Sequence, residues 1–256
     1  MINYRDNKTI VLTILILLFI ISSSITSSES IKTISQISTD IKHNIIENND
    51  TTCAGYTLFS VPTPRAASDQ RAILIDMNGT IVHEWTITGF PAKMLPGGSL
   101  IGSAKTRGIL HQENIDLVQE SWDGDFEWEF SNWDDDNTGE KMARQHHDFQ
   151  REGNPVGYFS PGQEFVSNGT TLILAHYHNY DKNISHMKLK DDVIYEVDWN
   201  GNLTGFEWHA TDHFDEMEFD ILSKIGIYFF PGFNIFLIFQ TLPTDWFHMN
   251  SISMLG

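Results

Sequence analysis

From Tyr56 onward, short runs in which apolar and polar residues alternate are separated by two-residue turns. The turns are Asn-Gly or Asp-Gly pairs, which supply the positive φ angles that a type I′ hairpin turn requires. Alternation with a period of two is typical of a strand with one buried face. The chain therefore predicts three β-hairpins, at 73–85, 116–130 and 193–208, with turn glycines Gly79, Gly124 and Gly201.

A second type of hairpin alternates with the first. It is predicted at 92–104, and again from 147–151 to 169–176 across a long loop. Two hairpins make four strands, and Gly79 and Gly124 stand 45 residues apart, a spacing typical of one propeller blade. A β-sandwich is the competing architecture, but sandwiches do not normally repeat a sequence unit.

The predicted fold class is all-β, a β-propeller of four-stranded antiparallel blades. Residues 55–256 would hold about three blades, with the start of a fourth at 245–250. A propeller normally needs roughly four to eight blades to protect its sheet edges. We therefore expect an incomplete propeller, as a fragment or a truncated gene product.

The N-terminal segment has the layout of a signal peptide or membrane anchor, 1–27. Arg5 and Lys8 precede the apolar run 9–21, and small residues follow it. Residues 28–54 are rich in Ser, Thr, Ile and Asn without a stable period, which predicts a poorly ordered linker. We expect an extracytoplasmic protein, with possible membrane attachment through the leader.

A second apolar run covers 225–242. Its length approaches that of a membrane span, but Pro231, Gly232 and Asn234 interrupt it and argue against a clean helix. A buried strand pair, or an altered loop that was once polar, are the other interpretations.

The charge excludes one class of partner. The formal net charge is -18, and the 16 Lys and Arg are scattered along the chain. Such a surface repels a phosphate backbone, so nucleic acid is not an expected partner.

Histidine is the best clue to chemistry, since it can act as nucleophile, proton carrier or metal ligand near neutral pH. His146 and His147 begin a predicted strand, where neighbours face opposite sides, so only one is expected to face a central channel. Asp148 could orient a neighbouring imidazole. The alternative is a histidine that bonds a backbone carbonyl at the strand end.

Two further histidine settings carry period-2 spacing. His248 and Asn250 would share a strand face and could donate hydrogen bonds to one anionic group. His176 and His178 also share a face and could bind a metal with Asp181 or His186, although such pairs occur in strands without a metal role.

Several motifs, taken in order, resemble the arylsulfotransferase (aryl sulfate sulfotransferase) family. They are Ile-Asp-Met-Asn-Gly-Thr-Ile-Val-His-Glu-Trp at 75–85, Met-Leu-Pro-Gly-Gly-Ser-Leu at 94–100, His-His-Asp-Phe-Gln at 146–150, Tyr-Glu-Val-Asp-Trp-Asn-Gly at 195–201, Asp-His-Phe-Asp-Glu-Met at 212–217 and Asp-Trp-Phe-His-Met-Asn-Ser-Ile at 245–252. The likeness covers 56–220 and resumes at Asp245, while the apolar run between does not resemble the family loop.

The resemblance implies a six-bladed propeller, here its N-terminal half, that moves a sulfuryl group between phenols through a sulfated histidine. It implies aryl sulfate and phenol as small-molecule partners, and no cofactor or metal. His147 matches a channel-lining catalytic histidine, and His248 with Asn250 matches the pair that holds the sulfuryl oxygens. His146 is the substrate-binding alternative if the register slips by one.

The family's covalent histidine and an oxyanion-binding arginine lie beyond that pair, so this chain alone is expected to lack the nucleophile and to be inactive. A non-catalytic exported propeller that serves as a binding or scaffold module is the alternative. A metal-binding propeller that uses His176 and His178 is a third hypothesis.

Overall fold

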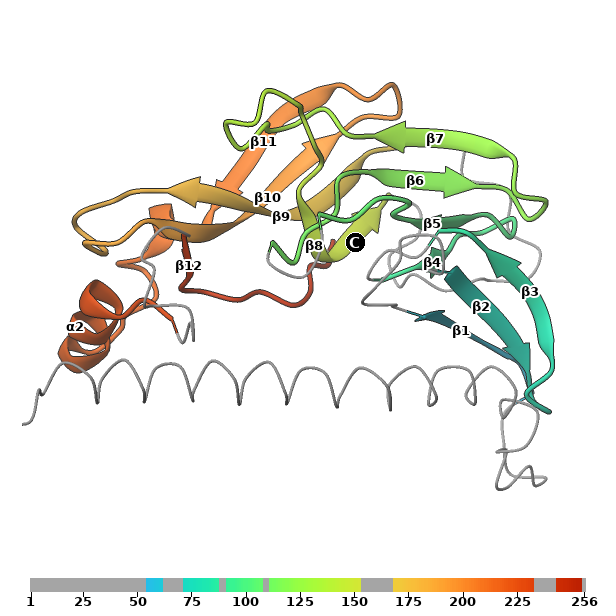
Figure 1. Cartoon of the computed structure of the whole chain (residues 1–256), viewed down its shortest axis with the longest axis horizontal. Coiled ribbons are helices and arrows are strands. Elements are labelled where there is room, and N and C mark those ends of the chain that lie inside the picture. Colours follow the sequence, from blue (N-terminus) through green and yellow to red (C-terminus); the bar gives the residue numbers. More distant parts are fainter. Residues whose placement is uncertain are drawn as a thin grey trace, which may run out of the picture. The chain divides into compact units, whose positions relative to one another are not determined.

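The computed structural model describes residues 54–61, 71–87, 91–107, 111–152, 168–232 and 243–254, and these are mostly β (Figure 1). The chain divides into two units, Met1–Thr57 with Ile75–Val82 and Leu58–Leu74 with His83–Gly256. The predicted leader, and the predicted linker apart from its last residue, lie outside the described residues. In the described part of the chain, no helix has both the length and the apolar character needed to cross a membrane.

The strands form three sheets, in which β1 to β11 follow chain order. The first holds β1 (Tyr56–Val61), β2 (Arg71–Asp76) and β3 (Ile81–Trp85); the second holds β4 (Lys93–Met94), β5 (Leu100–Gly102), β6 (Leu117–Glu120) and β7 (Phe126–Phe130); the third holds β8 (Gln145–Arg151), β9 (Thr171–Asn179), β10 (Leu189–Val197) and β11 (Leu203–His209), with β12 (Thr244–Asp245) beside β10.

The second and third sheets confirm the predicted four-stranded antiparallel units. Each joins two hairpins, and every strand from β4 to β7 and from β8 to β11 pairs antiparallel with its neighbour. The turn glycines Gly79, Gly124 and Gly201 have φ angles of 75°, 84° and 79°, so the turn prediction is confirmed. Closure of such sheets into a propeller stays a prediction.

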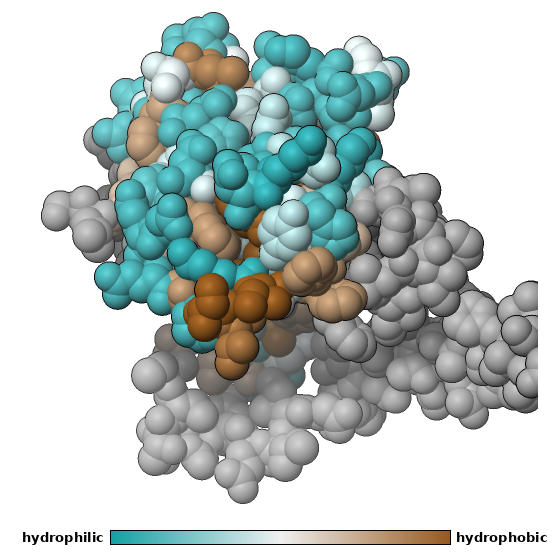
Figure 2. Space-filling view, turned by 90° about the vertical axis from the view of Figure 1, so that its left-hand side faces the viewer, coloured by the Kyte–Doolittle hydropathy of each residue, from teal (hydrophilic) through white to brown (hydrophobic). Residues whose placement is uncertain are grey.

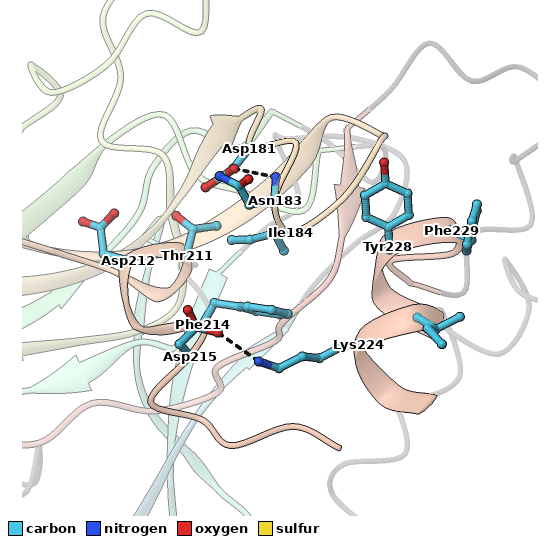
Figure 3. A pocket seen from close by; sticks show the side chains of 11 residues that line it. Asp181, Asn183, Ile184, Thr211, Asp212, Phe214, Asp215, Lys224, Tyr228 and Phe229 are labelled. Carbon is cyan, nitrogen blue, oxygen red and sulfur yellow. Dashed lines mark hydrogen bonds and ion pairs between the residues drawn. The ribbon is translucent and has the colours of Figure 1, made fainter. Parts of the chain in front are cut away.

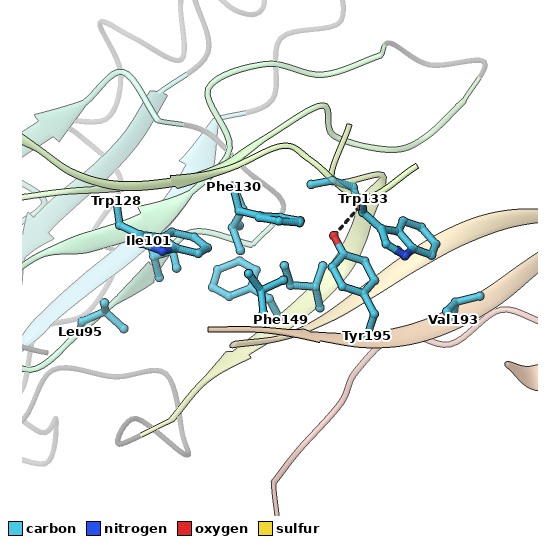
Figure 4. Packing of buried hydrophobic residues seen from close by; sticks show 13 residues of the cluster. Leu95, Ile101, Trp128, Phe130, Trp133, Phe149, Val193 and Tyr195 are labelled. Atoms are coloured by element: carbon cyan, nitrogen blue, oxygen red, sulfur yellow. Dashed lines mark hydrogen bonds between the residues drawn. The ribbon is translucent and has the colours of Figure 1, made fainter. Parts of the chain in front are cut away.

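A shared hydrophobic core joins the second and third sheets (Figure 4). Trp128, Phe130 and Trp133 lie in or just after β7, and they pack with Phe149 of β8 and Tyr195 of β10. The Tyr195 ring stacks on Trp133 with centroids 4.4 Å apart, and its hydroxyl donates to the Ala143 carbonyl at 2.7 Å. Buried aromatic contacts of this kind hold β8 and β10 in place. Strand β8 carries two of the histidines described below, and β10 carries Asp192, which lies beside them.

The first part of the second apolar run is helical, which corrects the expectation of a buried strand pair. Helix α2 (Ile221–Phe229) follows the short 3-10 helix η3 (Ala210–His213), and none of its side chains is buried. The Asp220 carboxylate caps it by accepting the N–H groups of Leu222 and Ser223. Residues 233–242 of that run lie outside the described residues.

Apolar side chains gather on the exposed surface of α2. Figure 2 shows a brown patch low on a face that is otherwise mostly hydrophilic. The most exposed apolar residues of this segment are Ile221, Leu222, Phe229 and Phe230, with exposed fractions of 70%, 76%, 51% and 72%. Alternation of apolar and polar residues gives no signal for this helix, because its second half, 225–229, belongs to the nearly continuous apolar run.

Strand β12 differs from the predicted start of a fourth blade. It pairs parallel with the first two residues of β10, Leu189 with Thr244 and Lys190 with Asp245. Strand β11 pairs with β10 only from Val193 onward, so β12 occupies the part of this edge that β11 leaves free. The described residues after Asp245 form no strand. A Cβ at Gly232, whose φ is 152°, would overlap the Asp245 carbonyl, so glycine is required where this segment passes.

Candidate functional site

Four histidines gather where β8, β9 and β10 of the third sheet meet the segment that follows β12. His146 and His147 come from β8, His176 from β9 and His248 from the segment after β12. The ring centroids of His146 and His176 are 3.7 Å apart, and those of His147 and His248 are 4.7 Å apart. All four residues were candidate site residues in the sequence, and the structure brings them into one cluster.

An irregularity in β8 allows two consecutive histidines to enter this cluster. The pairing of β8 with β9 shifts register between Gln145 and Phe149, and His147 has a φ of 52°. A bulge of this kind re-aims side chains that a regular strand would send to opposite faces. The rings of His146 and His147 are 5.3 Å apart, so both histidines belong to the cluster, and which of them faces a central channel stays a prediction.

The outer pair of imidazoles lies at the surface, where His248 is exposed and His147 is partly buried. The Nε2 atoms of His147 and His248 lie 2.7 Å apart, which requires one ring to donate a proton and the other to accept it. The Asp245 carboxylate lies 2.8 Å from His248 Nδ1 and fixes that ring. Burial lowers the pKa of His147, and the neighbouring His146 and His248 lower it further. The outer pair therefore holds an exchangeable proton on a surface that an anion can reach.

The inner pair is buried against Asp192. The Nε2 atom of His146 is 3.1 Å from Asp192 Oδ1, and that of His176 is 3.9 Å from the same oxygen. Burial lowers the pKa of His146 to about 3, lowers that of His176 further, and raises the pKa of Asp192 to about 7. Because burial disfavours the charged form of each group, the two imidazoles are neutral at neutral pH.

Backbone contacts fix the segment that carries His248. The N–H of Met249 donates to Asp192 Oδ2, and the N–H of Ile252 donates to Asp148 Oδ2 at 2.9 Å. Asp148, which the sequence suggested as an orienting group for an imidazole, instead holds this segment and binds Lys93 Nζ at 2.5 Å. Its role in the site is therefore to position the backbone.

Asn250 lies at the surface next to the outer pair. It is exposed, and its amide nitrogen is 3.4 Å from the carbonyl of His248. The predicted strand through His248 and Asn250 is absent, so the shared face does not arise from period-2 geometry. The weak contact leaves the amide able to turn toward a ligand held by His248.

The predicted metal group around His176 and His178 does not form with Asp181 or His186. His176 Nδ1 lies 3.6 Å from Glu113 Oε2, and His178 Nδ1 contacts the Asp136 carboxylate. Asp181 accepts the Asn183 N–H, and His186 bonds the carbonyl of Tyr228 at 2.6 Å. His176 and His178 do share a strand face, but their side chains lie beside Glu113 and Asp136 instead.

Two site residues escaped the sequence reasoning, namely Asp192 and Asp245. Asp192 stands in a run of charged residues, Lys190-Asp191-Asp192, that suggests a solvated surface, yet it is fully buried. Its burial depends on the segment after β12, which no local pattern predicts. Asp245 could have been predicted as a partner of His248, because it precedes that histidine by only three residues.

A separate pocket of about 710 Å³ lies between α2, η3 and the loop after β9 (Figure 3). Its charged lining consists of Asp181, Asp212, Asp215 and Lys224, and the lysine is already bound to Asp215 at 2.9 Å. An excess of carboxylates disfavours an anionic ligand. The histidine cluster is therefore the better candidate for anion chemistry.

Comparison with known proteins bears on the same region. Residues 137–256 match the model of the family described as arylsulfotransferase (ASST). Searches of curated proteins and of solved structures found no match. The matched residues include all four clustered histidines, Asp192, Asp245 and Asn250. The resemblance noted in the sequence is thus confirmed over residues 137–256, which are similar to the arylsulfotransferase (ASST) family.

Proposed function

We propose that the chain is an arylsulfotransferase-like protein whose outer histidine pair binds the sulfuryl group of an aryl sulfate for transfer to a phenol. The observation that carries this proposal is the contact of His147 Nε2 with His248 Nε2 at 2.7 Å, at the surface of a histidine cluster inside the matched region. The family match supports sulfuryl transfer in general. The roles of individual residues are our assignment.

The chemistry of the reaction explains why such a pair is suitable. In the first transfer, the sulfur–oxygen bond to the donor phenol breaks with its electron pair on the phenolate oxygen while an imidazole nitrogen bonds to sulfur. In the second, the acceptor phenol oxygen bonds to sulfur, the sulfur–nitrogen bond breaks with its electron pair on the imidazole, and the phenol proton passes to that imidazole. Donors around the sulfuryl oxygens stabilise the charge that develops, and a proton donor assists the leaving phenolate.

We assign binding and proton donation, rather than the covalent step, to the outer pair. His147 and His248 share one proton in the free protein, and a sulfuryl oxygen placed between them would accept it. Asp245 holds the Nδ1 side of His248, so its Nε2 atom faces the ligand. Asn250 adds a neutral donor. His146 lies behind the pair and is too buried for direct contact with a large substrate.

Ligand binding tests this assignment without requiring turnover. Calorimetric titration of the purified chain with 4-nitrophenyl sulfate should show binding that weakens about 10- to 100-fold in His147→Ala and in His248→Ala, the range expected for a lost hydrogen bond to a charged group. His213→Ala is the matched control, because the ring of that partly exposed histidine contacts Glu216 and Trp208, neither of which belongs to the cluster. Unchanged affinity in His248→Ala would refute the assignment.

The double variant sharpens the test. If the two rings act as one unit, His147→Ala with His248→Ala should cost little more than either change alone. Strictly additive losses would mean that the rings bind independently. Transfer from 4-nitrophenyl sulfate to phenol, measured by release of 4-nitrophenolate, is a separate measurement, and its absence would not contradict binding, because this chain is expected to lack the covalent histidine.

A binding or scaffold module is the second candidate, and the apolar surface of α2 favours it (Figure 2). Exposed apolar patches often mark protein interaction sites. A chain that binds no aryl sulfate would support this candidate instead.

A further inference from the structure

We propose that His146, His176 and Asp192 form a binding site for a divalent transition-metal ion, of which Zn²⁺ is the representative case. The site lies behind the outer histidine pair and shares no proposed ligand with it, although His176 is also within 4.8 Å of Asp245 and His248. It also differs from the metal group that the sequence suggested, because it excludes His178, Asp181 and His186.

The spacing of the ligand atoms supports the proposal. Each of the three residues offers one ligand atom, and these atoms lie within 4.8 Å of one another. The separations from Asp192 Oδ1 to the two Nε2 atoms are 3.1 Å and 3.9 Å, and they bracket the edge of about 3.3 Å expected for a tetrahedral zinc site. Two imidazoles and one carboxylate are a common donor set for Zn, Fe, Co or Ni.

The buried atoms at this position lack ordinary partners. Among the described residues, both ring nitrogens of His146, both of His176 and Asp192 Oδ1 are buried and make no hydrogen bond of ordinary geometry, apart from a weak contact of His146 with the Ala175 backbone. Buried polar atoms are almost always paired, so three neighbouring residues with unpaired atoms call for a common explanation. A bound cation would satisfy Asp192 Oδ1 and one nitrogen of each ring at once.

Surrounding groups have the arrangement found around metal ligands. Asp192 Oδ2 accepts the N–H of Met249, which orients the carboxylate. Glu113 Oε2 lies 3.6 Å from His176 Nδ1 and is itself held by Arg144 Nε at 3.2 Å. Carboxylates that face the second nitrogen of a ligating histidine fix its tautomer and its orientation.

A second group of potential ligands, His111, Glu113 and Asp136, does not share these properties. Arg107 contacts both carboxylates, and Arg144 contacts Glu113 as well. Two guanidinium groups already compensate this charge, so the inner histidines are the stronger site.

The bound ion should change the ring geometry. The rings of His146 and His176 are stacked with an angle of 13° between them. An ion that lies in the plane of both rings requires them to tilt apart. X-ray absorption at the zinc edge should therefore show two imidazole nitrogens and at least one oxygen in the first coordination sphere.

Metal content provides the main test. The full chain, stripped with EDTA, exposed to ZnCl₂ and desalted, should retain about one zinc per chain by mass spectrometry. His146→Gln and Asp192→Asn should lose this zinc, with affinity reduced at least 10-fold, the low end for a lost metal contact. His178→Gln, a change two residues from His176 on the same strand, is the matched control and should retain it.

X-ray absorption and metal retention of the unmodified chain also test the proposal. If a ligand variant fails to fold, the absorption spectrum of the unmodified chain decides, because coordination without two imidazoles would overturn the site. Failure of the unmodified chain to retain zinc, cobalt or nickel would also overturn it and leave a buried water as the occupant. His248→Ala should retain zinc even if it no longer binds 4-nitrophenyl sulfate, so the two proposals fail separately.

Discussion

His178 illustrates how burial at a single residue couples stability to pH. Burial lowers the pKa of His178 to about 4, and the neighbouring Arg144 adds to the shift. An unfolded imidazole titrates near 6.5, so between that value and about 4 the unfolded chain binds one more proton than the folded chain. Stability from this residue is therefore lost as pH falls through the window, by up to about 1.4 kcal/mol per pH unit.

His178→Gln should flatten that dependence. The amide keeps a donor for Asp136 but does not titrate, so urea unfolding should show a smaller loss of stability than the unmodified chain between about pH 6.5 and about pH 4. The comparison isolates His178, because His146, His176 and Asp192 are the same in both proteins. His213→Gln should leave the slope as it was, and parallel stability curves for His178→Gln would contradict the prediction.

At the scale of residues, the sequence predicts the individual histidines of the site but not that they meet. Sequence motifs identified His146, His147, His176 and His248 separately, because each stands in a short pattern that can be recognised by itself. Their meeting depends on a bulge with a positive φ at His147 and on the parallel pairing of β12. Neither follows from local alternation, since both depend on contacts between residues far apart in the chain.

At the scale of elements, helix α2 depends on its cap. The Asp220 carboxylate accepts the N–H groups of Leu222 at 2.8 Å and Ser223 at 3.0 Å, and no α2 side chain is buried. Asp220→Ala should therefore destabilise the helix by roughly 1 kcal/mol, which is about fivefold faster amide exchange in α2. Asp220→Asn retains the acceptor and should exchange more slowly than the alanine variant. Equal exchange in the two variants would show that the cap is unimportant.

Hairpins and α2 differ in how far the sequence could predict them. The turns at Gly124 and Gly201 place a positive φ at a fixed point between alternating runs, so local chemistry alone defines those hairpins. The second half of helix α2, 225–229, lies in a nearly continuous apolar run, where periodicity does not separate helix from strand. Its start depends on the side chain of Asp220, and Phe229 is its last residue, two before Pro231.

At the scale of the whole molecule, the repeated four-stranded unit was predictable because it is built from local hairpins. The second and third sheets and their shared aromatic core confirm that unit. The family match over 137–256 adds a functional class to it. The closure of the propeller and the extracytoplasmic location stay predictions, since they concern relations that the described residues do not test.

The net charge of the chain should weaken the binding of an anionic ligand. The chain carries a formal charge of -18, and the proposed ligand is an anion, so distant carboxylates oppose its approach while the contacts at His147 and His248 attract it. Raising the ionic strength from about 0.01 M to about 0.15 M shortens the Debye length from about 30 Å to about 8 Å. This change screens the distant charges more than the direct contacts. Affinity for 4-nitrophenyl sulfate, measured by calorimetry, should therefore rise several-fold with added NaCl, whereas affinity for neutral phenol should not change. A fall in affinity with salt would mean that positive charge near the histidines dominates the field of the whole chain.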